Sequence, residues 1–251
     1  MIIQANPIEQ VLNRWNFILS GFIVTMWLYL WALIIGFFLG LLLAILRVYG
    51  KSFHPPYTTP LSWIASGYIE IIRGTPLLAQ IFFFYFLPLS LNLPLGNWEL
   101  KTVSTFLGKN ISVIWLNPQT LVAILTLGLN SAAYQAEYFR GAIISISSEQ
   151  LITAQSLGMS RGAGIRRVIL PQALRRVIPA WSNEAAYLPK YTVVVYFIAV
   201  SDLFAQAYAV AFATFAVIFT YIIVALLFLV VITLVSKALD ILYKRTRIPG
   251  L

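Results

Sequence analysis

Long apolar runs separated by short polar stretches dominate the chain. A helix needs about 20 mostly apolar residues to cross the hydrocarbon core of a bilayer, and five segments meet this requirement. We expect spans at 17–46, within 61–91, and at 119–139, 178–200 and 212–242. The pattern therefore predicts an all-α membrane protein whose residues 1–251 form a single transmembrane domain.

The composition agrees with a membrane protein. Hydrophobic residues make up 60% of the chain and charged residues only 10%, whereas soluble domains average about 25% charged residues. The absence of cysteine excludes disulfides and any Cys-based metal or redox site. The net charge of +9 does not indicate nucleic-acid binding, because no basic stretch is interleaved with stacking aromatic residues.

Lys and Arg predict the orientation, because they are enriched in cytoplasmic loops. Three of them, Arg14, Lys101 and Lys109, fall on one side of the predicted spans and twelve on the other. The twelve are Arg47, Lys51, Arg140, Arg161, Arg166, Arg167, Arg175, Arg176, Lys237, Lys244, Arg245 and Arg247. We therefore expect the N-terminus outside, the C-terminus in the cytoplasm and a cytoplasmic loop over 140–177. The connection from 88 to 118 is the longest polar connection on the outer side, and its Asn-Leu-Pro and Gly-Asn pairs are expected to form turns.

No motif predicts an enzyme, a bound cofactor or a metal site. Gly50-Lys51-Ser52 resembles the end of a phosphate-binding loop, but Ile45 occupies the position where that motif needs glycine. His54 is the only histidine, and without nearby carboxylates it makes neither a metal site nor a catalytic triad. Any ATP chemistry must therefore come from a partner.

The second apolar segment contains charged residues and a proline. Glu70 and Arg73 lie three residues apart, on one helix face, and can pair. Pro76 cannot donate a backbone hydrogen bond and favours a break. We expect an interfacial helix up to Arg73 and a crossing that starts near Thr75. A structural ion pair and a role in lining a pathway both remain open.

The first and third spans carry helix-packing and polar signals. Gly36 and Gly40 leave room for the close approach of another helix. Asn130, Tyr134 and Glu137 recur at helical spacing and form a polar stripe. Such a stripe faces either other helices or a wet cavity. The three-residue spacing of an acid and an arginine recurs here in Glu137 and Arg140.

The cytoplasmic loop is expected to hold two short helices. The first reaches Leu157, and Gly158 suits the left-handed position that ends a helix. Ser160 can cap the second helix, and Pro171 is expected to interrupt the chain before the next span. This element suits docking of a partner, with an amphipathic hairpin that binds anionic headgroups as the alternative.

This loop resembles the cytoplasmic "EAA" loop of permease subunits in bacterial and archaeal ATP-binding-cassette importers. The resemblance is carried by Gly158 and, after nine intervening residues, Val168-Ile169-Leu170-Pro171. Further motifs are similar to the polar amino-acid branch. They are Ser156-Leu157-Gly158-Met159-Ser160, Val168 to Arg175, Arg73-Gly74-Thr75-Pro76-Leu77-Leu78, and Asn130-Ser131-Ala132-Ala133-Tyr134 with Glu137 and Arg140-Gly141.

The sequence departs from this family in two places. The name-giving Glu-Ala-Ala falls on Ile152-Thr153-Ala154, and Glu149 lies one helical turn earlier. The fourth span has Lys190-Tyr191-Thr192-Val193 where the branch usually shows Lys-Asp-Thr-Ser, and Glu184 and Pro189 are unusual there. These departures concern coupling strength and substrate preference.

The resemblance implies partners. A cytoplasmic ATP-binding subunit would hold ATP and Mg and receive the first short helix of the loop in a groove. An external solute-binding protein would deliver substrate, and a second permease half, identical or homologous, would complete the path in the cell membrane. The residues implied for coupling are Glu149, Leu151, Ala154, Leu157, Gly158, Ser160, Leu170 and Pro171.

The expected function is a permease subunit that moves polar amino acids inward and has no catalytic residues of its own. Its candidate path residues are Asn130, Tyr134, Glu137, Asn183 and Glu184. Carboxylates there would favour cationic amino acids. The alternatives are a self-sufficient channel or secondary transporter not coupled to ATP, a membrane-embedded enzyme, and a purely structural subunit.

Overall fold

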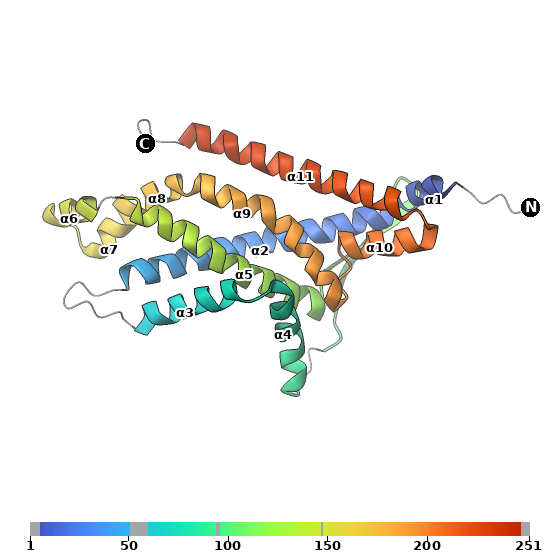
Figure 1. Ribbon diagram of the computed structural model, residues 1–251, viewed down its shortest axis with the longest axis horizontal. Helices are drawn as coiled ribbons and strands as arrows, with labels where there is room; N and C mark the ends of the chain where they lie inside the picture. Colours follow the sequence, from blue (N-terminus) through green and yellow to red (C-terminus); the bar gives the residue numbers. More distant parts are fainter. Residues whose placement is uncertain (1–5, 51–59, 94–95, 147, 247–251) are drawn as a thin grey trace, which may run out of the picture. The chain divides into compact units, whose positions relative to one another are not determined.

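The computed structural model describes residues 6–50, 60–93, 96–146 and 148–246, and helices form most of them (Figure 1). The elements in chain order are α1 (Pro7–Asn13), α2 (Trp15–Tyr49), α3 (Pro60–Gly74), α4 (Leu77–Ser90), β1 (Leu100–Phe106), β2 (Lys109–Leu116), α5 (Pro118–Ile144), α6 (Ser148–Ser156), α7 (Arg161–Gly164), the π-helix η1 (Ile165–Ile169), α8 (Leu170–Arg176), α9 (Ile178–Tyr191), the 3-10 helix η2 (Thr192–Ile198), α10 (Leu203–Thr214) and α11 (Val217–Thr246). Lys51, Ser52, His54 and Arg247 lie outside the described residues.

The chain divides into two compact units. One comprises residues 1–33, 76–128 and 187–233, and the other comprises residues 34–75, 129–186 and 234–251. The first has a core of Val11, Ile18, Leu203, Ala207, Val210 and Val224. The second has one core of Ala44, Phe139, Ala142, Ile143, Ile146, Leu151, Ile169, Ala173 and Val177, and another of Leu43, Ala65, Ile69, Ala132 and Ala136.

Two described helices, α2 and α11, are long and apolar enough to cross a membrane on their own. Two broken pairs meet the same test, α3 with α4 and the run α9–η2 with α10. Length and composition thus support two spans, or four if each pair crosses once, within the described part of the chain. The five-span count stays a prediction. The predicted third span corresponds to α5, which does not meet the test for a membrane span. Its second half carries polar side chains such as Asn130, Gln135 and Glu137.

The break predicted at Pro76 is confirmed. Helix α3 ends at Gly74 and α4 begins at Leu77. Because proline has no backbone N–H, it cannot continue the hydrogen-bond ladder of α3. The hydroxyl of Thr75 donates instead to the carbonyl of Ile71, at 2.8 Å. The side chain before the proline therefore satisfies one of the carbonyls left open at the helix end.

The expectation that Pro171 interrupts the chain is wrong. Pro171 lies in the first turn of α8, and helical structure runs from Arg161 to Arg176. A proline ring in a helix clashes with the carbonyl four residues earlier, which here belongs to Arg167 in η1. The π turn of η1 is wider than an α turn and leaves room for the proline ring. The hydrogen-bond pattern therefore changes locally, and the helical structure continues through Pro171.

The outer connection contains a β-hairpin, which the sequence pattern did not predict. Strand β1 pairs antiparallel with β2, from Phe106 opposite Lys109 to Leu100 opposite Leu116. Leu107 and Gly108 have φ angles of 48° and 74°, and two positive φ values are typical of the type I′ turn that matches the twist of a hairpin.

A further helix, α10, occupies residues that were predicted to connect the last two spans. Its N-cap is Asp202, whose side chain accepts a hydrogen bond from the Ala205 N–H at 2.9 Å. The hydroxyl of Thr25 on α2 accepts another from the Leu203 N–H at 3.0 Å. These two acceptors satisfy donors that any helix start leaves open, so the chain forms a new helix where a loop was expected.

Candidate functional site

A chain of buried hydrogen bonds joins α5 to α9 inside the second unit. The hydroxyl of Ser131 donates to Glu184 Oε1 at 2.6 Å. Gln135 Nε2 donates to that hydroxyl at 3.0 Å, and Trp181 Nε1 donates to Gln135 Oε1 at 2.6 Å. Ser131, Gln135 and Glu184 are buried. A polar network in an apolar interior is stable when its members satisfy one another, and it then fixes one arrangement of the helices.

Two glycines of α2 make space for this network. A Cβ at position 36 would collide with Gln135 Nε2 and lie 3.0 Å from the Ser131 hydroxyl. A Cβ at position 40 would lie 2.9 Å from the carbonyl oxygen of Ala132 and 3.1 Å from the nitrogen of Ala136. The prediction that Gly36 and Gly40 permit close helix approach is therefore confirmed, and the helix that approaches is α5.

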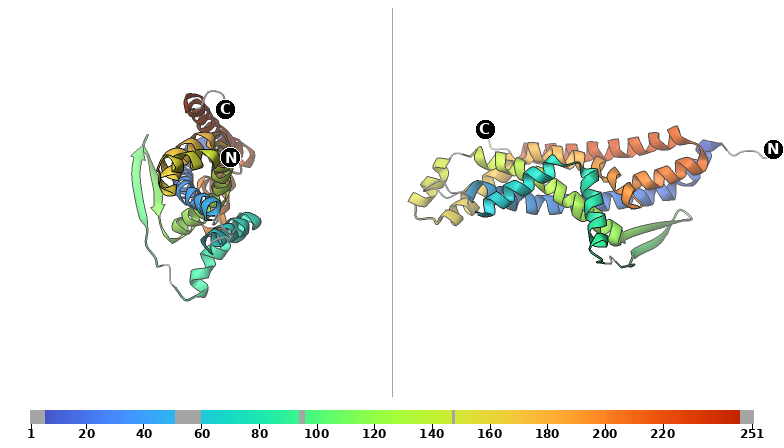
Figure 2. Two further views of the ribbon diagram at one scale, coloured as in Figure 1. Left: turned by 90° about the vertical axis from the view of Figure 1, so that its left-hand side faces the viewer. Right: turned by 60° about the horizontal axis from the view of Figure 1, so that its bottom comes forward.

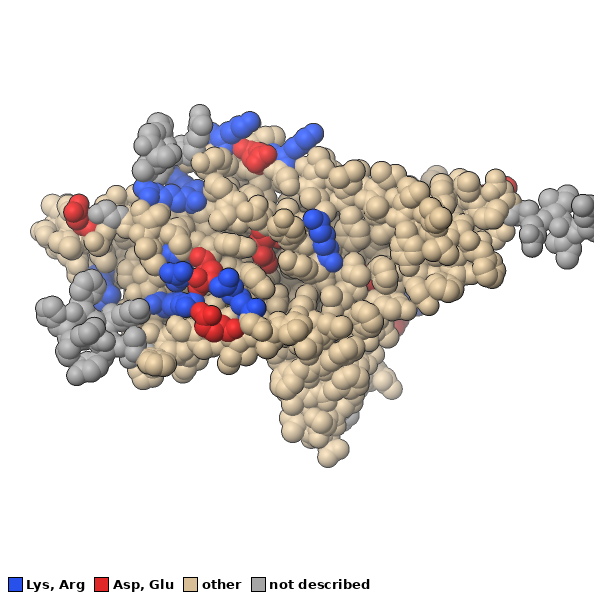
Figure 3. All heavy atoms as spheres, in the orientation of Figure 1, with Lys and Arg blue, Asp and Glu red and all other residues tan. Residues whose placement is uncertain are grey.

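An ionic cluster surrounds Glu137 on α5. Arg47 from α2 donates to one carboxylate oxygen of Glu137 and, at 2.8 Å, to Glu70 on α3. Arg140 donates through Nε at 3.0 Å and Nη2 at 2.8 Å to the other oxygen of Glu137. The three-residue spacing of Glu137 and Arg140 noted in the sequence thus corresponds to an ion pair. Figure 3 shows acidic and basic side chains gathered on a face that is otherwise largely uncharged.

The predicted pair of Glu70 with Arg73 is wrong. Glu70 pairs with Arg47. Arg73 lies 4.0 Å from Glu137 and places its guanidinium 5.4 Å from the ring centroid of Tyr134. The physical reason is burial, because the Glu137 side chain is 16% exposed and that of Glu70 is 65% exposed. Charges interact more strongly where less water screens them, so Arg73 turns toward the more buried acid.

The structure does not gather the five candidate path residues into one site. Asn130 and Glu184 are buried, Tyr134 lies under Arg73, and Asn183 is exposed. Glu137 is held by arginines, an arrangement that favours a structural role. The sequence reasoning missed Ser131, Gln135 and Trp181. The signal for the first two was their spacing, because residues four apart share a helix face.

The residues implied for coupling build a compact element around α6. Leu151 and Ala154 are buried, whereas Glu149, Leu157 and Gly158 are exposed. Gly158 has φ 85°, so the predicted left-handed position after the helix is confirmed. Ser160 accepts a hydrogen bond from the Ala163 N–H at 3.3 Å and caps α7, as predicted. Leu170 packs against the adjoining core, and Pro171 is exposed.

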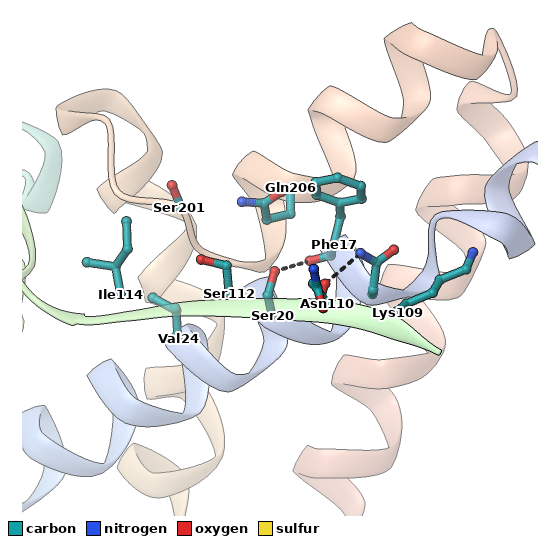
Figure 4. A pocket seen from close by; sticks show the side chains of 10 residues that line it. Phe17, Ser20, Val24, Lys109, Asn110, Ser112, Ile114, Ser201 and Gln206 are labelled. Carbon is teal, nitrogen blue, oxygen red and sulfur yellow. Dashed lines mark hydrogen bonds between the residues drawn. The ribbon is translucent and has the colours of Figure 1, made fainter. Parts of the chain in front are cut away.

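A cavity of about 480 Å³, lined by both polar and apolar side chains, lies in the first unit, between α2, strand β2 and the start of α10 (Figure 4). Its polar lining residues are Asn16, Ser20, Lys109, Asn110, Ser112, Ser201 and Gln206. No group of His, Cys, Asp and Glu side chains that could hold a metal ion occurs in the part of the chain that the structure describes.

The chain matches the family described as binding-protein-dependent transport system inner membrane component over residues 36–248. The chain belongs to this family. The resemblance inferred from the motifs is confirmed. The family assignment supports the permease subunit of an importer and gives no support to the alternative of a self-sufficient channel.

Similar proteins cover almost the whole permease. It is 32% identical over 227 residues to the arginine transport system permease protein ArtQ of Bacillus subtilis (strain 168), covering 89% of this chain and 91% of the relative. It is 31% identical over 236 residues to the glutamine transport system permease protein GlnP of Escherichia coli (strain K12), covering 92% and 93%.

Solved structures agree with this assignment. A chain of an amino acid ABC transporter crystallised with histidines superposes with a TM-score of 0.72 at 30% identity, covering 91% of the permease and 94% of that chain. A chain of the MetNI methionine ABC transporter in an inward-facing conformation gives a TM-score of 0.64 at 16% identity, covering 97% and 100%. The second likeness concerns the fold alone.

Proposed function

We propose that this chain is the permease subunit of an ATP-binding-cassette importer that carries polar amino acids, cationic ones among them, into the cytoplasm. The observation that carries the proposal is the element α6–Gly158–α7, in which the family motif builds a short helix fixed on one face and exposed on the other. Relatives named for arginine and glutamine transport support the substrate class.

Helix α6 is the proposed contact with a cytoplasmic ATP-binding subunit. Leu151 and Ala154 fix the helix to its own unit, and the side chain of Leu151 packs where a Cβ on Gly164 would lie at 2.8 Å. The opposite face presents Ile152, 59% exposed, and Leu157 follows the helix with 80% exposure. We propose that these two exposed apolar residues belong to the surface that binds the partner. ATP and Mg would reside on that partner.

The proposed topology has five spans, with the N-terminus outside and the C-terminus in the cytoplasm. Helix α5 serves as the third span, although its composition is too polar by itself. Ser131 and Gln135 are buried against neighbouring side chains, and polar groups within a bilayer are tolerated when they face a helix partner. The excess of Lys and Arg on one side supports the orientation in a cell membrane.

The substrate path is proposed to run beside Glu184 and Asn130, with Tyr134, Asn183 and Glu137 as further candidates. Of the two candidate carboxylates, that of Glu137 is paired with arginine, whereas that of Glu184 accepts a hydrogen bond from the Ser131 hydroxyl. A second permease half, a copy or a homologous subunit, would cover exposed residues such as Asn183. An external solute-binding protein would deliver the amino acid.

ATP hydrolysis in proteoliposomes tests the function. The chain is reconstituted with its matched ATP-binding subunit and solute-binding protein, and hydrolysis is measured with a panel of amino acids. Stimulation by one or a few polar amino acids is the expected result. Assembly without stimulation by any of them would contradict the substrate class, and failure to assemble with a matched ATP-binding subunit would contradict the importer.

Substitutions then test the two sites separately. Ile152→Asp is expected to abolish association with the ATP-binding subunit, because it places a charge in the apolar contact. Ile144→Asp is the matched control, since Ile144 is 57% exposed on α5. Glu184→Gln is expected to reduce uptake of cationic amino acids more than that of neutral ones while leaving association intact. Equal losses by the two aspartate variants would contradict docking at α6.

A further inference from the structure

The hairpin β1–β2 has an open edge that the hydrocarbon core of a membrane does not accept. All seven residues of β1 are exposed, and among the described residues β1 pairs with β2 alone. Figure 2 shows the two strands as a ribbon beside the helices. In lipid every backbone N–H and C=O must be paired, so exposed strand edges do not occur there. The hairpin therefore needs water on its outer side.

The second strand lies along the first turns of α2. Asn16 Nδ2 donates to the carbonyl of Asn110 at 2.9 Å, and Trp27 Nε1 donates to the carbonyl of Trp115 at 2.8 Å. The helix advances about 16 Å between its two donors, and the strand advances about 16 Å between its two acceptors. The lengths match, so strand and helix run side by side over this distance (Figure 4).

The exposure of α2 changes where this contact ends. From Ile18 to Tyr29 no residue of α2 is exposed. From Leu30 onward an exposed apolar residue recurs every four positions, at Leu30, Ile34, Phe38 and Leu42. A four-residue repeat marks one face of a helix. A stripe of large apolar side chains on a membrane helix is the surface that meets lipid tails.

Three tryptophans lie at this transition. The ring of Trp27 is 5.5 Å from that of Trp31 and 5.2 Å from that of Trp115, measured between centroids. Tryptophan is enriched where a membrane meets water, because its ring is apolar and its N–H is polar. The next charged residue of α2 is Arg47, 20 residues after Trp27, and this length corresponds to about 30 Å of helix, the thickness of a hydrocarbon core.

We propose that, on the side of α2 that carries the hairpin, the hydrocarbon core begins at the cluster Trp27–Trp31–Trp115. The cluster binds the lipid headgroup region, and the hairpin stands in water beyond it. The cavity beside Asn16 and Asn110 then opens to water, which its amide and hydroxyl side chains can contact. The proposal rests on the proposed function only for placing the hairpin and the first turns of α2 on the outer side of the membrane.

Site-directed spin labelling tests the boundary, since the chain has no native cysteine. Phe17→Cys and Phe38→Cys form a matched pair, because both phenylalanines lie on α2 and are exposed. Ser104→Cys probes β1. In lipid vesicles, the ratio of accessibility to oxygen over accessibility to a polar nickel chelate is expected to be several-fold higher at position 38 than at positions 17 and 104. Only variants with unchanged apparent melting temperature are compared.

Two results would overturn the proposal. One is an oxygen-rich environment at positions 17 and 104 that equals the environment at position 38. The other is a label at position 104 that neither reagent reaches, because another protein surface would then cover the hairpin. A membrane-impermeant maleimide added to right-side-out vesicles tests the orientation, which belongs to the proposed function, separately from the membrane boundary. Labelling of Ser104→Cys only after the vesicles are permeabilised would refute the orientation and leave the boundary in place.

Discussion

The contact between α2 and α5 gives the sharpest quantitative prediction. Gly40→Ala adds one methyl group whose carbon would lie 2.9 Å from a backbone oxygen and 3.1 Å from a backbone nitrogen of α5. Backbone atoms of a packed helix cannot rotate away as a side-chain end can, so the helices must move apart. Overpacking of this kind costs about 1–3 kcal/mol.

The same substitution at Gly67 on α3 is the matched control. No heavy atom lies within 4 Å of a Cβ built there. Glycine in a helix is less favourable than alanine by about 0.5–1 kcal/mol, so Gly67→Ala should stabilise the chain slightly. Both variants gain the stabilisation that comes from replacing a helical glycine with alanine. The difference between them therefore isolates the overlap of α2 with α5.

The assay is thermal unfolding of the purified chain in one detergent, followed by size-exclusion chromatography with fluorescence detection. One kcal/mol shifts the melting temperature of a chain of this size by about 2–4 °C. Gly40→Ala is expected to melt roughly 2–12 °C below Gly67→Ala. Equal melting temperatures, or a more stable Gly40→Ala, would refute the reasoning, because the two helices would then have spare room at this position.

Three further predictions use the same assay. Glu137→Gln should cost about 1–3 kcal/mol, because it weakens charged hydrogen bonds at a side chain that is 16% exposed. Glu70→Gln, at a side chain that is 65% exposed, should cost only about 0–1 kcal/mol. Similar losses of stability in the two variants would contradict the central place of Glu137 in the ionic cluster. Asp202→Ala should cost about 1 kcal/mol through loss of the α10 cap, and Asp202→Asn, which keeps the accepting oxygen, should not; a destabilised Asn variant would show that the charge matters. Trp181→Phe should cost about 0.5–1.5 kcal/mol by removing the hydrogen bond that the indole N–H donates to the Gln135 oxygen, and an unchanged melting temperature would mean that this bond adds nothing.

Helix breaks and ends were readable from local chemistry. Pro76 stops α3 because proline has no N–H to give, and the left-handed backbone at Gly158 follows from a residue without a Cβ. The signal at Asp202 was equally local, since aspartate is a preferred helix cap, but it was not used, and α10 was missed. The hairpin was missed because the preference of a residue for a strand depends on its packing against cross-strand neighbours more than on its type alone.

The choice of ionic partner was not readable from spacing. Glu70 and Arg73 suit a pair within one helix, yet Arg47 from α2 pairs with Glu70. Interactions between residues three or four apart on a helix surface contribute only about 0.2–0.5 kcal/mol. A partner from another helix in a less hydrated position can outweigh them, and its identity depends on the packing of α2 against α3 and α5.

The sequence by itself determined that this chain lies in a membrane and that it belongs to a family of importer permeases. Both follow from properties that act over a few residues at a time, namely apolar segment length, charge placement and motif order. Only the tertiary structure decided that Ser131, Gln135 and Trp181 connect Glu184 into one buried network, and that β2 lies along α2 up to Trp27. These relations join residues far apart in the chain, and the free energy that selects them comes from packing and desolvation in three dimensions, which no local pattern records.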